Sequence, residues 1–499
     1  MNFVIVYHQS DNFGDNLIGE CFGQLLKAAL INYGLGSKDY RICYLPLMSN
    51  ELDVVREADA VYFAGGGLFG LCYLNFYEPM RKIAEMADAA GVPVFFSSMG
   101  INNMDANEEN EHLLGELLAI PSIQDISVRE NPSIFRYYAD MSGRGKKLQI
   151  RTVADPVTWA GAVYANSLKK AAGKESEACP ADGRKLIGIN VIRAGLIRAN
   201  DRSWGLTNQA EYVTELRRIL IDRGFRVCLY TNGSTNDENT MCYIAEKSNI
   251  SRKELITVMT SRQLISMISA CDGIAASRMH SSIISYALNI PATNIVWNDK
   301  IPCFYDECGL SGRVFSIDDE EGNPLKPVDV AKKVADRLCE LTDGKHSQSV
   351  DESYLMSLYD YIYQSVGAIL RNSSSGISEC TEYKYNEVCE KLSSLELPTG
   401  FDISDMENKI YGSQKRYAEI YMKSRDKDKT LKRKDKKIEQ LREIRKDLRH
   451  ECVHLKKTCD ALEIKNAELE QENEKLRAKV AHFENKRVVK IYRKIRKFV

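Results

Sequence analysis

A short segment near the middle of the chain combines residue types that suit the binding and protonation of an anionic substrate. Arg278 and His280 directly follow the apolar run GIAA (273–276), and a helical pattern begins at about Ser281. A guanidinium can bind a phosphate or carboxylate through two parallel hydrogen bonds, and an imidazole can exchange a proton near neutral pH. The free N–H groups of a helix N-terminus favour an anion beside them. Together these features predict an anion-binding site that contains an acid or a base.

Arg193 extends this site, because it ends another apolar segment, KLIGINVIR (185–193). Parallel strands of one sheet end at the same edge, so Arg193 and Arg278 are expected to lie at that edge together. A second positive charge there would suit a dianionic ligand. The competing interpretation gives Arg193 and His280 structural roles only. The convergence of an arginine, a histidine and a helix start argues against it for His280.

The motif HQSDNFGDN (8–16) is a candidate for the other side of a ligand site. It follows the first apolar run and precedes a helical pattern, and Gly14 would permit a tight turn there. Asp11, Asn12, Asp15 and Asn16 can cap the helix or hold hydroxyl groups of a ligand. Ordinary helix capping remains the alternative.

A second glycine motif, AGGGLFG (64–70), follows the third apolar run. Gly65, Gly66 and Gly67 would let the backbone approach a ligand closely and would offer N–H groups to it. No Lys-Ser or Lys-Thr pair follows, so the motif is not a P-loop. A simple turn remains the alternative.

The elements that must position these residues alternate between strands and helices over the first 160 residues. The apolar runs are continuous, which is typical of strands buried on both faces of a parallel sheet. Strands are expected at 3–8, 40–46, 60–67, 93–100 and 126–130. Helices are expected between them, near 16–32, 74–90, 107–120 and 132–140.

The alternation restarts after a polar stretch at 168–184, which indicates a linker. Further strands are expected at 185–193, 225–230, 255–260, 273–276 and 292–297. The pattern predicts an α/β protein with two tandem sheets and a ligand site in the cleft between them. We assign 1–170 to an N-terminal domain, 183–345 to a C-terminal domain and 346–404 to a helical extension, with 330–400 packed around or after the second domain.

Residues 405–485 have the pattern of a coiled coil. Leucine recurs every seventh residue at 441, 448, 455, 462, 469 and 476. Asn466 and Asn473 fall at the facing core positions, where paired amides favour a parallel, in-register dimer. We therefore expect a parallel homodimer through 431–485. The alternative is one amphipathic helix packed on the globular body.

The charge of the chain is divided unequally along its length. The total is −1, yet residues 401–499 hold 29 Lys and Arg against 18 Asp and Glu, and residues 1–400 hold 39 against 51. The last stretch, KRVVKIYRKIRKFV (486–499), has seven basic residues, no acidic one and an apolar helical face. This pattern predicts a helix lying on an anionic membrane surface. Nucleic acid is not expected, because the segment lacks a stacking platform of aromatic residues.

The composition excludes several classes of protein. A chain of 499 residues with 44% apolar and 27% charged residues is neither disordered nor a small disulfide scaffold. Its 14 cysteines form no CxxC pair, so reduced thiols, no metal and no bound cofactor are expected. The first residues do not resemble a secretory signal, and no run is long enough to cross a bilayer. We expect a cytoplasmic protein, peripheral on the inner face of the plasma membrane if its tail binds there.

In the order of its motifs, the sequence resembles the polysaccharide pyruvyl transferase family over roughly residues 1–320. The motifs that carry the resemblance are NFGDN (12–16), AGGGLFG (64–70), FFSSMGIN (95–102), SVREN (127–131), ADPV (154–157), GINVIR (188–193) and SRMHSSIISYALNIPA (277–292). The resemblance implies two Rossmann-like domains arranged as in GT-B glycosyltransferases. It also implies transfer of a pyruvyl group from phosphoenolpyruvate to a sugar as a cyclic ketal, with release of phosphate.

The resemblance also implies roles for individual residues. The family's Arg-X-His motif matches Arg278 and His280, which would bind the donor and supply the acid. Arg193 and Lys300 match further donor-binding positions, and Ser281 begins the helix beside the donor. Asn12, Gly14, Asp15 and the three glycines at 65–67 would lie on the side of the acceptor, a sugar or glycan that can be lipid-linked.

Two other functions fit the same sequence. One is a GT-B glycosyltransferase that uses a nucleotide-sugar, which would share the cleft and the phosphate-binding helix. The other is a non-catalytic, dimeric scaffold tethered to a membrane. The coiled coil supports this function, whereas the intact Arg278 and His280 argue against it.

Overall fold

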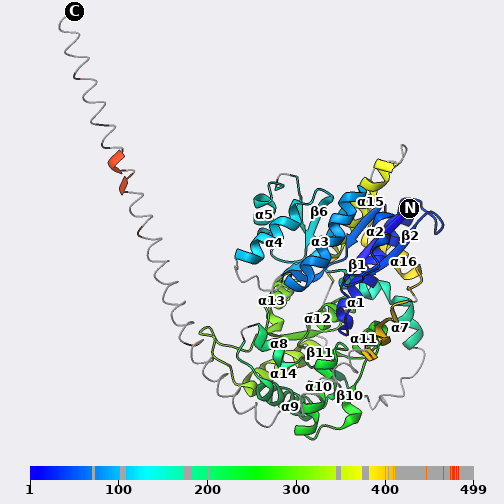
Figure 1. Cartoon of the computed structure of the whole chain (residues 1–499). Coiled ribbons are helices and arrows are strands. Elements are labelled where there is room, and N and C mark those ends of the chain that lie inside the picture. The colour runs from blue at the N-terminus through cyan, green and yellow to red at the C-terminus, as the bar shows by residue number, and fades with distance from the viewer. Residues whose placement is uncertain are drawn as a thin grey trace, which may run out of the picture. The chain divides into compact units, whose positions relative to one another are not determined.

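The computed structural model divides the chain into two compact units, residues 1–415 and 416–499 (Figure 1). The structure describes residues 1–69, 73–101, 108–145, 147–172, 183–200, 202–343, 350–373, 381–398, 400–402, 404–407, 409–410, 446, 465, 472–473, 475–477, 479, 482 and 490. In the second unit the described residues are helical. The predicted coiled coil (405–485) and basic tail (486–499) lie largely outside the described residues, so both stay predictions.

The first half of the larger unit is built on a parallel sheet with strand order β2-β1-β3-β5-β6-β7, and β4 pairs with β5. Its strands are β1 (Asn2–Tyr7), β2 (Arg41–Pro46), β3 (Ala60–Phe63), β4 (Gly66–Phe69), β5 (Val94–Ile101), β6 (Ile123–Val128) and β7 (Ile150–Thr152). The predicted strands are present, but the run at 60–67 is divided into β3 and β4. The three-residue strand β7 was not expected.

The second half has a parallel sheet of its own, with strand order β10-β9-β8-β11-β12-β13. Its strands are β8 (Leu186–Asn190), β9 (Arg226–Tyr230), β10 (Leu255–Ile256), β11 (Gly273–Ala276), β12 (Ala292–Val296) and β13 (Val314–Ser316). The chain runs outward from β8 in one direction and then from β11 in the other. The point where the order reverses, between β8 and β11, is where ligands of such sheets bind.

Helices connect the parallel strands, as the alternation predicted. In the first half they are α1 (Phe13–Asn32), α2 (Asp53–Arg56), α3 (Tyr73–Ala90), α4 (Glu108–Ala119), α5 (Pro132–Met141), the 3₁₀ turn η1 (Pro156–Trp159), α6 (Ala160–Val163) and α7 (Ala165–Ala172). In the second half they are α8 (Ala194–Ala199), α9 (Leu206–Asp222), α10 (Thr235–Lys247), η2 (Arg252–Glu254), α11 (Ser261–Ser269), α12 (Met279–Ala287), α13 (Lys300–Glu307), η3 (Ser311–Arg313) and α14 (Pro327–Thr342).

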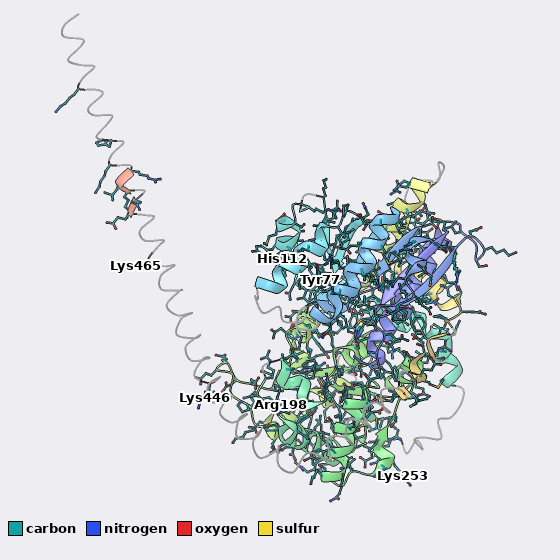
Figure 2. The ribbon with its side chains drawn as sticks, viewed as in Figure 1. Tyr77, His112, Arg198, Lys253, Lys446 and Lys465 are labelled. Atoms are coloured by element: carbon teal, nitrogen blue, oxygen red, sulfur yellow. The ribbon has the colours of Figure 1, made fainter. Side chains whose placement is uncertain are left out.

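Side chains labelled in Figure 2 mark the two halves. Tyr77 and His112 belong to α3 and α4 of the first half, and Arg198 and Lys253 belong to α8 and η2 of the second. In the part of the chain that the structure describes, we find no helix long and apolar enough to span a membrane.

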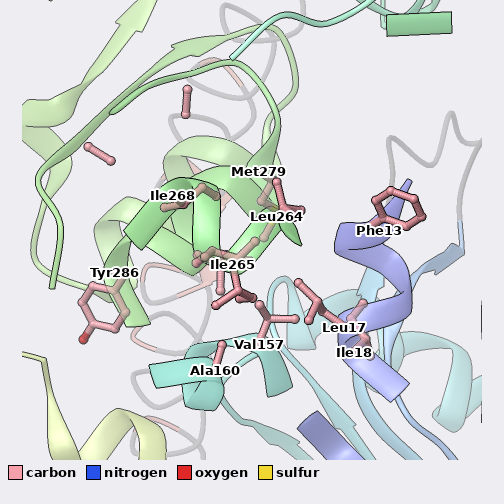
Figure 3. Close-up of a cluster of buried hydrophobic side chains, with 14 of the residues drawn as sticks. Phe13, Leu17, Ile18, Val157, Ala160, Leu264, Ile265, Ile268, Met279 and Tyr286 are labelled. Carbon is pink, nitrogen blue, oxygen red and sulfur yellow. The ribbon is translucent and has the colours of Figure 1, made fainter. Parts of the chain in front are cut away.

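One hydrophobic core is continuous through both halves (Figure 3). It brings α1 of the first half against α11 and α12 of the second, with the turn at η1 and α6 beside them. The contact is made by Phe13, Leu17, Ile18, Val157, Ala160, Leu264, Ile265, Ile268, Met279 and Tyr286. A second core, within residues 4–148, fills the opposite face of the first sheet. The two sheets are therefore joined by packed side chains as well as by the connecting chain.

The last two helices, α15 (Glu352–Ser373) and α16 (Tyr385–Ser394), return to the first half. The Tyr361 hydroxyl donates to the Phe96 carbonyl at 3.2 Å, and Ser365 and Tyr62 share a hydrogen bond of 2.8 Å. The expectation that 330–400 would pack around or after the second domain therefore holds for α14, whereas α15, which follows that domain in the sequence, packs against the first half. The sequence pattern of an amphipathic helix does not indicate which of the two sheets its apolar face will cover.

Helix α1 is buried along most of its length, including a carboxyl group at Glu20 that is 1% exposed. The Tyr164 hydroxyl donates to one Glu20 oxygen at 2.6 Å. Burial raises the pKa of Glu20 to about 8, and the nearby charge of Asp405 acts in the same direction. A carboxyl that is neutral at pH 7 can occupy this core.

We expect Glu20 to make the stability of the protein depend on pH. Between about pH 4.5, the usual value, and about pH 8 the folded chain binds this proton and the unfolded chain does not. The free energy of unfolding should therefore fall as pH rises through that range. The substitution Glu20→Gln should reduce the fall by about 2 to 4 kcal/mol, measured as urea unfolding at pH 5 and pH 8. Glu407→Gln, at an exposed site, is the control, and identical slopes in the wild type and Glu20→Gln would contradict this account.

Candidate functional site

His280 lies in the first turn of α12, which begins at Met279, two residues before the expected start. The residue is 7% exposed. Its Nδ1 atom lies 3.5 Å from a carboxylate oxygen of Asp15, and its Nε2 atom lies 3.8 Å from a carboxylate oxygen of Asp155. Asp15 belongs to the start of α1 and Asp155 to the turn after β7. A histidine of the second half is thus held between two carboxylates of the first.

Both carboxylates are ionised at neutral pH. Burial alone would favour the neutral form of Asp15, but two histidines and an arginine, foremost His8, hold its pKa well below the usual range. Burial opposes ionisation of Asp155 as well, yet His280 and Arg129 lower its pKa to about 2. A proton on either nitrogen of the His280 ring therefore faces an anion.

Gly14 permits the close approach of α1 and α12. A Cβ atom at this position would lie 2.5 Å from the Cβ atom of His280 and 2.7 Å from its Nδ1 atom. Carbon atoms do not approach so closely, so only glycine fits here without a shift of the imidazole. The expected tight turn at Gly14 is wrong, because Gly14 is the second residue of α1. A glycine is required at position 14 because a side chain there would clash with His280 of the second half.

Arg278 is held by a buried carboxylate, that of Asp237. The Nε and Nη2 atoms of Arg278 lie 2.8 and 2.7 Å from one oxygen of Asp237, and the other oxygen accepts the backbone N–H of Arg193 at 2.9 Å. Asn190 accepts the backbone N–H of Arg278 at 2.9 Å. The two predicted donor-binding arginines are therefore brought together, and a single carboxylate fixes the position of both.

Lys300 is the first residue of α13, and it lies near the cations and anions of the first half. Burial, followed by the positive charge of Arg129, lowers the pKa of Lys300 to about 8, although Glu130 opposes the shift. Arg129 itself is buried and contacts Glu130 at 2.9 Å and Asp155 at 2.5 Å. Lys300 is therefore protonated at neutral pH but loses its proton at a lower pH than an ordinary lysine.

Two of the other predicted residues make hydrogen bonds within the protein. The Ser281 hydroxyl is buried and donates to the Asn232 side chain at 2.7 Å. Asn12 precedes α1 but makes no capping hydrogen bond, and its amide donates instead to Asp15 at 3.0 Å. Ser281 and Asn12 therefore orient neighbouring groups of the site.

The glycines at 65–67 lie beside the first turns of α1. Gly65 and Gly66 have φ values of +110° and +102°, which favour glycine, and a Cβ atom on Gly65 would lie 2.8 Å from the Ser98 carbonyl oxygen. Both positions approach Ile18, one helical turn after Gly14. Gly65 lies between β3 and β4, whereas Gly66 and Gly67 belong to β4.

Three charged residues of this site were not assigned from the sequence: Arg129, Asp155 and Asp237. Arg129 follows β6, Asp155 follows β7 and Asp237 follows β9, so all three lie after the carboxyl ends of strands. The rule that located Arg278 could have found Arg129, which stands in the quoted motif SVREN. Nothing in the sequence pairs Asp237 with Arg278. Among the described residues, no group of three or more His, Cys, Asp or Glu side chains is arranged to hold a metal ion.

A family model described as polysaccharide pyruvyl transferase matches residues 12–299, more than half of the chain. The chain belongs to the polysaccharide pyruvyl transferase family. The matched range contains every residue assigned to the site from the sequence except Lys300, which follows its last residue. Membership implies a transferase that acts in polysaccharide biosynthesis.

The chain also matches solved structures, among them three at 12 to 15% sequence identity. UDP-GlcNAc 2-epimerase from Neisseria meningitidis is 13% identical, with a TM-score of 0.43 over 74% of this chain and 100% of that one. The epimerase from Methanocaldococcus jannaschii is 12% identical, with a TM-score of 0.46 over 74% and 100%. ADP-heptose LPS heptosyltransferase II from E. coli is 15% identical, with a TM-score of 0.37 over 68% and 98%. Comparison with curated protein sequences gives no match.

The contact between Gly14 and His280 can be tested through stability. Gly14→Ala would place a methyl group against the imidazole, and overpacking of this kind lowers the free energy of unfolding by about 1 to 3 kcal/mol. Gly115→Ala, in α4, meets no atom within 4 Å and should gain about 0.5 to 1 kcal/mol as a helix substitution. Urea unfolding measures both, and equal stability of the two variants would contradict the close approach.

Proposed function

We propose that this protein transfers a pyruvyl group from phosphoenolpyruvate to the hydroxyl groups of a sugar, forming a ketal and releasing phosphate. The observation that carries the proposal is the position of His280, buried between two ionised carboxylates beside Arg278 and Lys300. Phosphoenolpyruvate carries a phosphate and a carboxylate, so it requires several cations. It also requires an acid, which the imidazolium form of His280 would be.

The reaction begins at the methylene carbon of the donor. His280 gives its proton to that carbon, which becomes a methyl group, and the adjacent carbon becomes oxocarbenium-like. A first sugar hydroxyl adds to the oxocarbenium-like carbon. The bond between this carbon and the oxygen of the phosphate group then breaks. A second hydroxyl of the same sugar adds to complete the ring. Of the two hydroxyl protons, one replaces the proton lost by His280 and the other leaves with phosphate.

The surrounding charges fit this sequence of steps. Asp15 and Asp155 would hold the orientation of the ring, because each faces one nitrogen. Arg278, Arg193 and Lys300 would stabilise the negative charge on the departing phosphate, which is how cations lower the barrier of such steps. The acceptor would approach along the start of α1 and the glycines at 65–67.

Two other activities remain outcomes of the same assay. A nucleotide-sugar glycosyltransferase would release a nucleoside diphosphate instead of phosphate. A non-catalytic scaffold would release neither. Incubation with phosphoenolpyruvate or nucleotide-sugars, over a panel of acceptor glycans, separates the three functions.

The role of His280 predicts the result of one substitution. His280→Gln should lower phosphate release from phosphoenolpyruvate by at least about 100-fold, because general acid catalysis contributes 10²- to 10⁴-fold. Binding of the donor, measured by calorimetry without acceptor, should change little. His112→Gln, on the exposed surface of α4 (Figure 2), is the matched control and should retain full activity. Normal turnover by His280→Gln would refute the assignment.

The lowered pKa of Lys300 predicts that donor binding depends on pH. Above about pH 8 this side chain loses its proton, so the affinity for phosphoenolpyruvate should fall as pH rises from 7 to 9. The donor phosphate itself is fully ionised over this range, because its second pKa is about 6. Calorimetric titration with phosphoenolpyruvate measures the effect.

Two variants of Lys300 separate this effect from other titrations. Lys300→Arg keeps its charge and should extend tight binding to pH 9, whereas Lys300→Met should bind weakly and without this dependence on pH. A wild-type affinity that stays constant up to pH 9 would count against a role for Lys300 in donor binding.

A further inference from the structure

A segment beyond the family-matched range lies against the start of α1. We name residues 398–410 the C-terminal strap, of which 398, 400–402, 404–407 and 409–410 are described. Asp405 is 1% exposed and accepts three hydrogen bonds. One comes from the Asn16 side chain at 2.7 Å, and two come from the backbone N–H and hydroxyl of Ser261, both at 2.8 Å. One carboxylate thus bonds to both halves of the protein.

Lys409 of the strap also contacts both halves, and Phe401 adds contacts to the first half. Lys409 is 3% exposed, and its ammonium donates to the Gly233 carbonyl and to Glu238 at 2.5 Å each. The same ammonium lies 5.7 Å from the centre of the Phe13 ring, within the range of a cation–π interaction. Phe401 packs against the rings of Tyr7 and Tyr44 from the first half.

The strap contacts residues on both sides of the Gly14–Asp15 pair. Asn16 directly follows Asp15, and its amide is fixed by two bonds to Ser10: its oxygen accepts the Ser10 N–H at 3.0 Å, and its nitrogen donates to the Ser10 carbonyl at 2.9 Å. Phe13 precedes Gly14, and its backbone N–H donates to the Asn232 carbonyl at 2.8 Å. The segment that presents Asp15 to His280 is therefore held by strap contacts to the residues on either side of it, Phe13 and Asn16.

We propose that Asp405 is a positioning residue whose carboxylate holds residues 10–16 in place, so that Asp15 stays against the imidazole of His280. The catalytic part of this proposal rests on the acid role proposed above for His280. The positioning part does not, because the geometry at His280 can be observed without any substrate. The C-terminal strap is then part of the working site, although Asp405 lies more than 100 residues beyond the range that the family model matches.

The sharpest test is the isosteric substitution Asp405→Asn. Asn16 must present its NH₂ group to residue 405, because Ser10 fixes the amide, and Ser261 presents a backbone N–H from the other side. An asparagine at 405 would direct its own NH₂ group at one of these donors, so one of the hydrogen bonds must be lost. Glu407→Gln removes the same charge from an exposed position of the strap and is the matched control.

We expect two results for Asp405→Asn and neither for Glu407→Gln. The ring-nitrogen resonances of His280, assigned by comparison with His280→Gln in ¹⁵N-histidine-labelled protein, should shift because Asp15 moves relative to the ring. The kcat with phosphoenolpyruvate should fall by about 10- to 100-fold, since small displacements in a catalytic site have effects of this size, while its KM changes less than about threefold. A purely structural role would lower the melting temperature and leave these resonances of the folded variant unchanged. That outcome would overturn the proposal.

A milder variant covers the case in which Asp405→Asn does not fold. Ser261→Ala removes one hydroxyl bond to Asp405 and lies on α11, outside the 10–16 segment, so it should shift the same resonances by a smaller amount. Unchanged resonances in folded Ser261→Ala would then overturn the proposal. If the wild type releases no phosphate from phosphoenolpyruvate, the proposed reaction fails, and the resonances of His280 still decide whether Asp405 positions Asp15.

Discussion

The approach of two helix N-termini, α1 and α12, is the constraint on which this structure depends. The imidazole of His280 reaches Asp15 and Asp155 only because no side chain stands at Gly14. The carboxyl edges of the two sheets must therefore face each other at one distance. The hydrophobic contact of α1 with α11 and α12 sets that distance, because packed side chains leave little freedom for the sheets to separate.

Buried carboxylates hold the cations of the site that we propose for an anionic donor. Residues 1–400 have an excess of acidic side chains, yet Arg278 and Arg129 are each tied to a buried aspartate. Such pairs fix the geometry of a cation and also neutralise part of its charge. Lys300 differs, because burial and a neighbouring arginine weaken its hold on the proton. The site thus combines two kinds of positive group: arginines held by buried aspartates, and a lysine that loses its proton more readily than usual.

The sequence predicts what is local in this fold and misses what depends on distant partners. Continuous apolar runs located the central strands, but β7 and β13 have three residues each and carry too little pattern to be recognised. Arg278 and His280 were found because strand, turn and helix start are contiguous there. Asp237 was not assigned, since its partnership with Arg278 depends on the pairing of β9, β8 and β11. The role of Gly14 was misjudged in the same way, because the residue that requires a glycine there, His280, lies 266 positions away in the sequence.

The hydrogen bond between Asn16 and Asp405 joins residues 389 positions apart, so during synthesis it can form only long after Asn16 has been made. At 5 to 20 residues per second, synthesis reaches Asp405 roughly 20 to 80 seconds after Asn16. During that interval both sheets can form on the ribosome, while the segment that carries Asp15 lacks its last support. The first loop of the chain can therefore gain this contact only after both sheets have been synthesised.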